Sequence, residues 1–249
     1  MTPPLPLILL HPYPTDATFW DGMRRHLDPE RPIISVNAPG FGDQPPSPGW
    51  TIDGAAAQVA AHIDTQTPNG TAAVLGLSMG GYIALSLAAH FPGRCARLVL
   101  ADTRADPDDP ATRAARIVAI AAIRAGHHAE YLAALLPRLL GPGAPPQIHR
   151  ELAVLAERQS PAALVGALSA LAARPDRRPD LRHLDMPTLV IVGAEDQVTP
   201  PRAARELARE IPHAHLVEIA GTGHLSALER PDTVAQHVEA FLARDPTSC

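Results

Sequence analysis

Lysine is absent from the sequence, so all 21 basic side chains among its 249 residues are arginine. The 26 acidic residues outnumber them and leave a net charge of −5 at pH 7. Chains that bind nucleic acid normally carry a basic excess, so this balance argues against a nucleic-acid partner. The missing lysine, together with abundant alanine and proline, is typical of a biased genome composition and points to no particular function.

Cysteine is scarce too, with only Cys95 and Cys249. Neither has the spacing of a metal ligand, and two isolated cysteines do not form a disulfide framework. We therefore expect no metal, no organic cofactor and a reducing, cytoplasmic location. Cys95 stands just before an apolar run and is predicted to be a small buried side chain.

Long hydrophobic runs are missing as well, and no stretch reaches the roughly 20 residues of a membrane-spanning helix. The apolar run at residues 5–10 is short and lacks both a basic leader and a small-residue cleavage site. It is predicted to be a first strand and not a signal peptide. Hydrophobic residues still make up 46% of the chain, enough for one large core with or without a small lid.

Six short apolar runs predict strands, and stretches with helical spacing lie between them. The strands are expected at residues 5–10, 32–36, 72–77, 98–101, 188–192 and 215–219. The helices that alternate with them are expected at residues 54–63, 79–90, 201–210 and 231–244. Continuous apolar strands that alternate with helices predict an α/β fold with a mostly parallel sheet flanked by helices.

Residues 106–183 interrupt this alternation, because no strand is predicted there. Helical spacing at residues 113–125, 129–140, 148–158 and 161–172 is broken by proline and glycine. Because the segment is inserted before the last strands, we predict a helical cap, or lid, on a core of residues 1–105 and 184–249. A helical bundle that only completes the fold is the alternative.

The side chains of this helical segment are expected to be mostly structural. The apolar residues Ile117, Ile120, Ile123, Leu135 and Leu136 are predicted to pack in the core. Four arginines, any of which could meet a substrate carboxylate, are expected to be solvated: Arg113, Arg116, Arg124 and Arg138. The pair His127 and His128 shows no ligand spacing and is interpreted as surface.

The stretch Gly76-Leu77-Ser78-Met79-Gly80 has the G-x-S-x-G pattern of a nucleophile elbow. It ends a predicted strand and opens a predicted helix, which is the context that this motif requires. A serine on so tight a turn leaves no room for side chains two residues away on either side. The following helix aims backbone N–H groups at a developing oxyanion. An incidental serine in a glycine-rich turn is the alternative.

A serine nucleophile needs a base, and His224 is the candidate among twelve histidines. It lies in a glycine-rich loop after the last predicted strand. The base needs an acid that fixes its tautomer, and Asp196 follows the strand at residues 188–192. Glu195, its neighbour, is the second choice, and an acidic turn residue without catalytic role is the alternative.

Two backbone N–H groups are predicted to form the oxyanion hole. One belongs to Met79, directly after the nucleophile, and the other should come from the loop after the first strand. Pro12 has no N–H, so Tyr13 is the expected donor. Pro14 favours an extended conformation at Tyr13, which would help to fix that N–H. A proline-rich turn without function is the alternative.

Five motifs in this order resemble the α/β-hydrolase superfamily over nearly the whole chain. They lie at residues 11–14, 37–42, 76–80, 193–200 and 221–231. The family pattern more often has glycine and aspartate where this chain has Pro12 and Asn37. Residues 98–105 and 173–176 are most similar to 3-oxoadipate enol-lactonases and their relatives.

The resemblance implies a serine hydrolase that cleaves a small-molecule ester or lactone through an acyl-enzyme. It implies catalytic roles for Ser78, Asp196 and His224 in the chain order expected for this fold. A C–C bond hydrolase or a cofactor-free perhydrolase would use the same three residues. A slow member of the fold that mainly binds a ligand is the remaining alternative, and the oligomeric state is left open.

Overall fold

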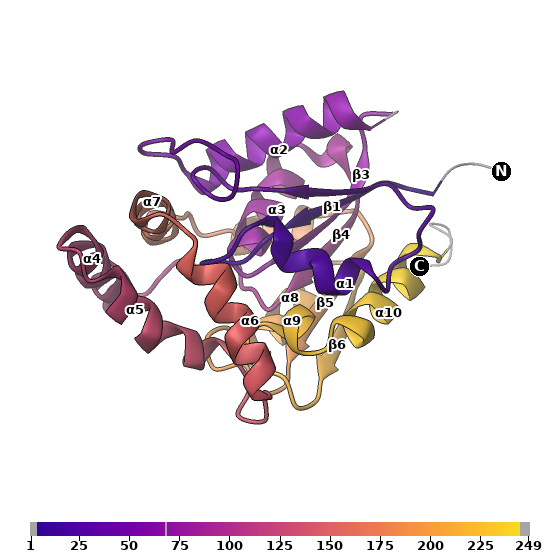
Figure 1. Ribbon diagram of the computed structural model, residues 1–249. Helices are drawn as coiled ribbons and strands as arrows, with labels where there is room; N and C mark the ends of the chain where they lie inside the picture. Colours follow the sequence, from indigo (N-terminus) through magenta and orange to yellow (C-terminus); the bar gives the residue numbers. More distant parts are fainter. Residues whose placement is uncertain (1–3, 68, 245–249) are drawn as a thin grey trace.

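The computed structural model describes residues 4–67 and 69–244, and Cys249 lies outside the described residues. Figure 1 shows a twisted sheet with helices packed around it. The described strands form one six-stranded sheet in the order β2-β1-β3-β4-β5-β6, and every pair is parallel. They are β1 (Leu7–Leu10), β2 (Ile33–Val36), β3 (Ala72–Leu77), β4 (Cys95–Ala101), β5 (Thr188–Gly193) and β6 (Ala214–Ile219).

The strands form because apolar side chains can be buried on both of their faces. Every residue of β1, β3 and β5 is buried, whereas β2 at the sheet edge is only half-buried. The α/β fold predicted from the sequence is confirmed, with its mostly parallel sheet flanked by helices.

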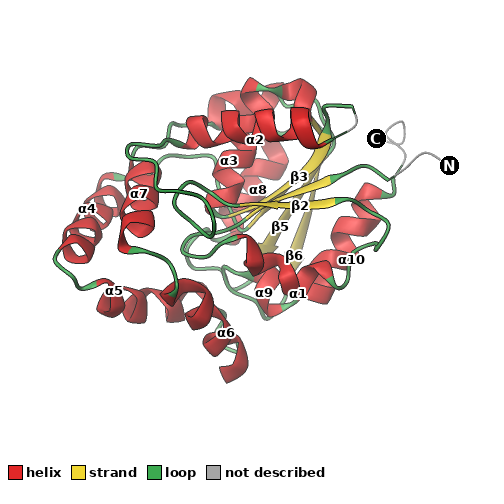
Figure 2. Ribbon diagram, turned by 45° about the horizontal axis from the view of Figure 1, so that its top comes forward, coloured by secondary structure: helices red, strands yellow, loops and turns green. Residues whose placement is uncertain are grey.

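Helices cover both faces of the sheet (Figure 2). On one face α2 (Ile52–Gln66) packs against α3 (Met79–His90). On the other, α1 (Asp21–Arg24) packs against α10 (Pro231–Leu242) and the short α9 (Ser226–Glu229). The remaining core helix, α8 (Pro201–Glu210), contacts β5 and β6. The short helices α1 and α9 were not predicted, since four residues carry too little periodicity.

Four helices connect β4 to β5 and lie on the side of the molecule opposite the chain termini (Figure 1). They are α4 (Pro110–Arg124), α5 (His128–Leu135), α6 (Pro146–Glu157) and α7 (Pro161–Ala172). A short 3-10 turn at Leu136–Leu139 follows α5, and another at Arg178–His183 follows α7. Ile123 and Leu136 are buried as predicted.

Two expectations for this helical segment are wrong. Ile117 is 60% exposed instead of packing in the core, because it lies on the outer face of α4. Arg116 is not simply solvated, since its guanidinium pairs with the buried carboxylate of Asp108 at 2.5 Å. Arg174 shares that carboxylate, so two cations meet one anion. The predicted surface residue His127 is exposed, and His128 is half-buried.

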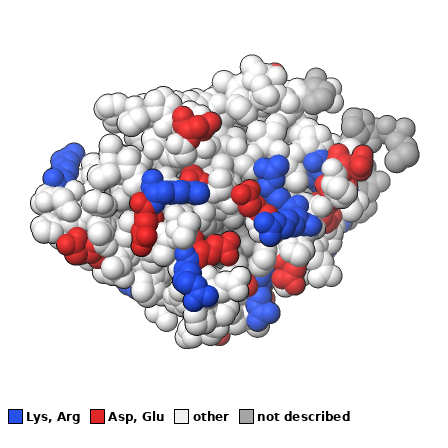
Figure 3. Space-filling view, viewed as in Figure 1, with Lys and Arg blue, Asp and Glu red and all other residues white. Residues whose placement is uncertain are grey.

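Charged side chains of both signs are mixed on the face drawn in Figure 3, and every basic residue is an arginine. Within residues 4–67 and 69–244 no helix combines the length and the apolar character that crossing a membrane requires. In the same part of the chain no three His, Cys, Asp or Glu side chains are grouped as metal ligands. Cys95 is buried, and burial raises the pKa of its thiol to about 12.

Candidate active site

The carboxyl ends of the strands bring the predicted site residues to one edge of the sheet. The parallel register pairs Leu10 with Gly76, Leu77 with Ala101, and Gly193 with Ile219. The segments that leave these ends therefore start side by side. They carry all five predicted site residues: Tyr13, Ser78, Met79, Asp196 and His224.

Ser78 occupies a sharp turn between β3 and α3. Its backbone is left-handed, with φ of 53°, a conformation that non-glycine residues seldom adopt. The turn is possible because glycines flank it: a Cβ at Gly76 would lie 2.1 Å from the carbonyl oxygen of Gly80. The Ser78 N–H donates to the Ala101 carbonyl, and the Thr103 hydroxyl donates to the Ser78 carbonyl. These bonds hold the strained residue on the neighbouring strand.

His224 joins Ser78 to Asp196 by two short contacts. Its Nε2 lies 2.8 Å from the Ser78 hydroxyl, and its Nδ1 lies 2.8 Å from a carboxylate oxygen of Asp196. Both the histidine and the aspartate are almost completely buried. Glu195, the second choice for the acid, is exposed, and its side chain makes no described hydrogen bond to His224.

The Asp196 carboxylate is held by its own loop. It accepts hydrogen bonds from the N–H groups of Val198 and Thr199 and from the Thr199 hydroxyl. Burial would raise the pKa of Asp196, but the charge of His224 and these hydrogen bonds lower it overall. Sequence reasoning missed Thr199, since a threonine three residues after an aspartate has no distinctive pattern.

His224 responds in the opposite direction. Burial lowers the pKa of this imidazole, but the negative charge of Asp196 and its hydrogen bond raise the pKa overall. The arrangement favours a histidine that accepts a proton readily at Nε2 while Nδ1 donates to the carboxylate. Such a histidine can serve as a general base toward the Ser78 hydroxyl.

The backbone N–H groups of Tyr13 and Met79 donate to no backbone carbonyl among the described residues. Met79 is the first residue of α3, and the N–H groups of the first turn of a helix have no partner within that helix. The Tyr13–Pro14 peptide bond is cis. Both N–H groups are thus free to donate to a bound oxygen, as an oxyanion hole requires.

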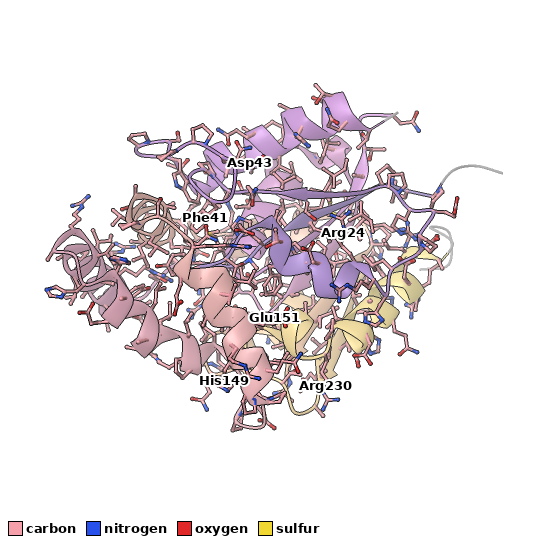
Figure 4. All side chains as sticks on the ribbon, viewed as in Figure 1. Arg24, Phe41, Asp43, His149, Glu151 and Arg230 are labelled. Carbon is pink, nitrogen blue, oxygen red and sulfur yellow. The ribbon has the colours of Figure 1, made fainter. Side chains whose placement is uncertain are left out.

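The loop that carries Tyr13 is fixed by His11, which the sequence analysis included only within a family motif. Its Nε2 accepts a hydrogen bond from the Ala38 N–H, and its Nδ1 contacts the Pro12 carbonyl. Burial lowers the pKa of His11 to about 4, so the ring is neutral at pH 7. Phe41, labelled in Figure 4, packs its ring against those of His11 and Tyr13.

Another buried carboxylate, Asp102, follows β4 and, like Ser78, has a left-handed backbone, with φ of 45°. One of its oxygens accepts from the N–H of Gly193, and the other accepts from the N–H and hydroxyl of Ser226. It thereby ties the strand before Asp196 to the helix after His224. The sequence reading included Asp102 only within a family motif.

A cavity of about 620 Å³ lies among α4, α5, α7 and the 3-10 turn at Leu136–Leu139, and Val198 of the Asp196 loop completes its wall. Its walls include Tyr131, Leu139 and Val198, together with the arginines Arg116 and Arg138. The Tyr131 hydroxyl lies 3.2 Å from that of Tyr13, and the Leu139 carbonyl accepts a hydrogen bond from the His224 N–H. The cavity wall is therefore bonded to two of the site loops.

Known proteins match this chain over most of its length. The model of the alpha/beta hydrolase family matches residues 7–237. A pimeloyl-[acyl-carrier protein] methyl ester esterase of Neisseria meningitidis serogroup A is 35% identical over 244 residues, which cover 94% of this chain and 73% of that protein. The 3-oxoadipate enol-lactonase 2 of Acinetobacter baylyi is 29% identical over 96% of this chain and 88% of its own length.

Among solved structures, a thermophilic esterase from Thermogutta terrifontis superposes with a TM-score of 0.91 at 32% identity. The match covers 96% of this chain and 89% of that one. The resemblance noted in the sequence is confirmed by these matches, and so is the prediction of a hydrolase. The chain belongs to the alpha/beta hydrolase family.

Proposed function

We propose that this chain is a serine hydrolase that cleaves a carboxylic ester or lactone through an acyl-enzyme. One observation carries the proposal: the Ser78 hydroxyl, the His224 imidazole and the Asp196 carboxylate are joined by two contacts of 2.8 Å. The relatives named as an esterase and an enol-lactonase support the choice of an oxygen ester as substrate. The expected cytoplasmic location remains a prediction.

In the first half-reaction the Ser78 oxygen attacks the substrate carbonyl while its proton passes to Nε2 of His224. The N–H groups of Tyr13 and Met79 hold the resulting oxyanion. When the tetrahedral intermediate collapses, the C–O bond to the leaving group breaks, and the leaving oxygen takes the proton from Nε2. The leaving alcohol or enol departs, or stays tethered to the acyl group when the substrate is a lactone.

In the second half-reaction water attacks the acyl-enzyme and gives its proton to the same Nε2. When the second tetrahedral intermediate collapses, the bond between the acyl carbon and the Ser78 oxygen breaks, Nε2 returns its proton to that oxygen, and the carboxylic acid is released. Throughout, Asp196 holds the Nδ1 proton and stabilises the imidazolium that forms twice in each cycle. No further co-reactant is required.

We also propose that residues 106–183 act as a cap that shapes the substrate site. The cavity of about 620 Å³, which is lined by this segment and by Val198 of the Asp196 loop, supports this role. Its size suits a small molecule, because ligand pockets are commonly about 300–1,000 Å³. Apolar side chains line most of it, and its polar lining residues are Thr112, Arg116, His127, Glu130, Tyr131 and Arg138.

The test is hydrolysis of p-nitrophenyl esters, simple lactones and an enol-lactone by the wild type and by Ser78→Ala. We expect Ser78→Ala to lower kcat by about three or more orders of magnitude on the preferred substrate. A fluorophosphonate probe should label the wild type and leave the variant unlabelled. Near-wild-type turnover by Ser78→Ala would refute the proposal, and failure to label would favour a ligand-binding role.

A further inference from the structure

Glu229, at the end of α9, bonds two backbone segments that are far apart in the sequence. One carboxylate oxygen accepts from the Gly223 N–H at 2.8 Å, in the loop that carries His224. The other accepts from the Gly141 N–H at 3.1 Å, just after the 3-10 turn of the helical segment. The His224 N–H itself donates to the Leu139 carbonyl at 3.0 Å. Three hydrogen bonds thus join residues 139–141 to the loop of the base.

The same two segments touch backbone to backbone. A Cβ at Gly223 would lie 2.3 Å from the Gly141 nitrogen, and one at Gly141 would lie 2.9 Å from the Gly223 nitrogen. On the opposite side, a Cβ at Gly193 would lie 2.0 Å from the Gly223 oxygen. The loop before His224 is therefore pressed between β5 and residues 139–141, and only glycine allows this approach.

Leu139 belongs to this contact and also to the wall of the large cavity. Its side chain is buried, so the wall cannot shift without moving the carbonyl that holds His224. Helix α6, where Figure 4 labels His149, starts a few residues after Gly141. The placement of the helical segment and the placement of the base are in this way mechanically linked.

We propose that Glu229 is a positioning residue for His224, which it serves by clamping residues 139–141 onto the His224 loop. The clamp sets the distance between Nε2 and the Ser78 hydroxyl and makes it depend on how the helical segment is seated. This inference rests on the proposed function, because it takes His224 as the base. Glu229 itself touches neither Ser78 nor His224 through its side chain among the described bonds.

The first test compares Glu229→Gln with Glu239→Gln. Glutamine at 229 presents an NH₂ group to one of the two N–H donors, so one side of the clamp opens. We expect kcat for a small p-nitrophenyl ester to fall by about 10- to 100-fold, with KM nearly unchanged, since a misplaced base slows chemistry more than binding. Glu229→Asp keeps both acceptor oxygens and should recover part of the loss.

Glu239 is the matched control, because its carboxylate also clamps a distant loop. It accepts from the Asp28 N–H and from the guanidinium of Arg31, remote from the site. Glu239→Gln should lower Tm and leave kcat unchanged. If Glu229→Gln lowered kcat only as far as Glu239→Gln does at an equal loss of Tm, the positioning role would be overturned.

A second pair of variants leaves Glu229 in place. Gly141→Ala would push residues 139–141 away from the His224 loop, whereas a Cβ at Gly143 meets nothing within 4 Å. We expect Gly141→Ala to lower kcat and Gly143→Ala to leave it unchanged. Equal kcat in both would overturn the inference, whether or not Glu229→Gln folds. The Ser78→Ala variant separates the two proposals: if it is inactive while Glu229→Gln and Gly141→Ala match the wild type, only this inference fails.

Discussion

Gly80, in the first turn of α3, lies against the end of β1 so closely that a Cβ would be 2.0 Å from the Leu10 carbonyl oxygen. Because that oxygen belongs to backbone, neither side can yield without moving a strand or a helix. Gly80→Ala should therefore lower the free energy of unfolding by about 1–3 kcal/mol. Gly93→Ala is the control, since a Cβ there meets nothing within 4 Å. Urea unfolding measures the free energy of unfolding of both variants, and equal values would contradict the close packing of Gly80 against Leu10.

The assignment of the acid can be tested on two neighbouring residues. Asp196→Asn keeps the shape of the side chain but removes the charge that stabilises the imidazolium of His224. We expect kcat to fall by about three to four orders of magnitude, with a much smaller change in KM. Glu195→Gln alters an exposed side chain and should stay within about twofold of the wild type. The reverse result would assign the role to Glu195.

The acidic side of the pH profile should report the ionisation of His224. Burial lowers its pKa, but the charge of Asp196 and the hydrogen bond to Asp196 raise the pKa overall. The protonated ring cannot accept the Ser78 proton. We therefore expect kcat/KM to fall as the pH drops through the pKa of His224, which lies above the pKa of a free imidazole. In Asp196→Asn the remaining activity should decline at a lower pH, because one negative charge is gone. If the acidic limb of the pH profile lay at the same pH in Asp196→Asn and in the wild type, a group other than His224 would be responsible for it.

The nucleophile loop could be predicted from the sequence because its determinants are local. A strand, a tight turn and a helix follow one another within residues 72–90, and the bounds of β3 and α3 match the prediction. The glycines that make the turn possible stand two residues before and after Ser78. The residues that determine this turn are neighbours in the chain, so the local sequence is enough to predict its geometry.

The supporting residues could not be predicted, since their partners lie far away in the chain. Glu229 bonds Gly141, which is 88 residues earlier, and Asp102 bonds Ser226, 124 residues later. Ile117 was misplaced for a related reason. The periodicity around it correctly predicts a helix, but only the packing of α4 decides which face of that helix is exposed. The strand β4 also begins at Cys95, three residues before the apolar run that predicted it.

Asp102 gives a stability prediction with a definite sign. Burial raises its pKa to about 7, with the charge of Asp196 acting in the same direction and that of His224 opposing it. In the unfolded chain the carboxyl titrates near its ordinary value, so between about pH 4 and 7 the folded state binds more protons than the unfolded one. The contribution of Asp102 to stability is therefore present at low pH and is lost as the pH rises toward 7.

Asp102→Asn cannot titrate, and its amide leaves one of the donors from Gly193 or Ser226 unpaired. The variant should be less stable than the wild type by about 1–3 kcal/mol near pH 5. The gap should narrow as the pH approaches about 8, because only the wild type loses the proton. Urea unfolding of both proteins across this range measures the difference directly, and the other titrating groups, present in both, largely cancel. A gap that widened with rising pH would mean that Asp102 is ionised throughout and stabilises the two site loops as a carboxylate.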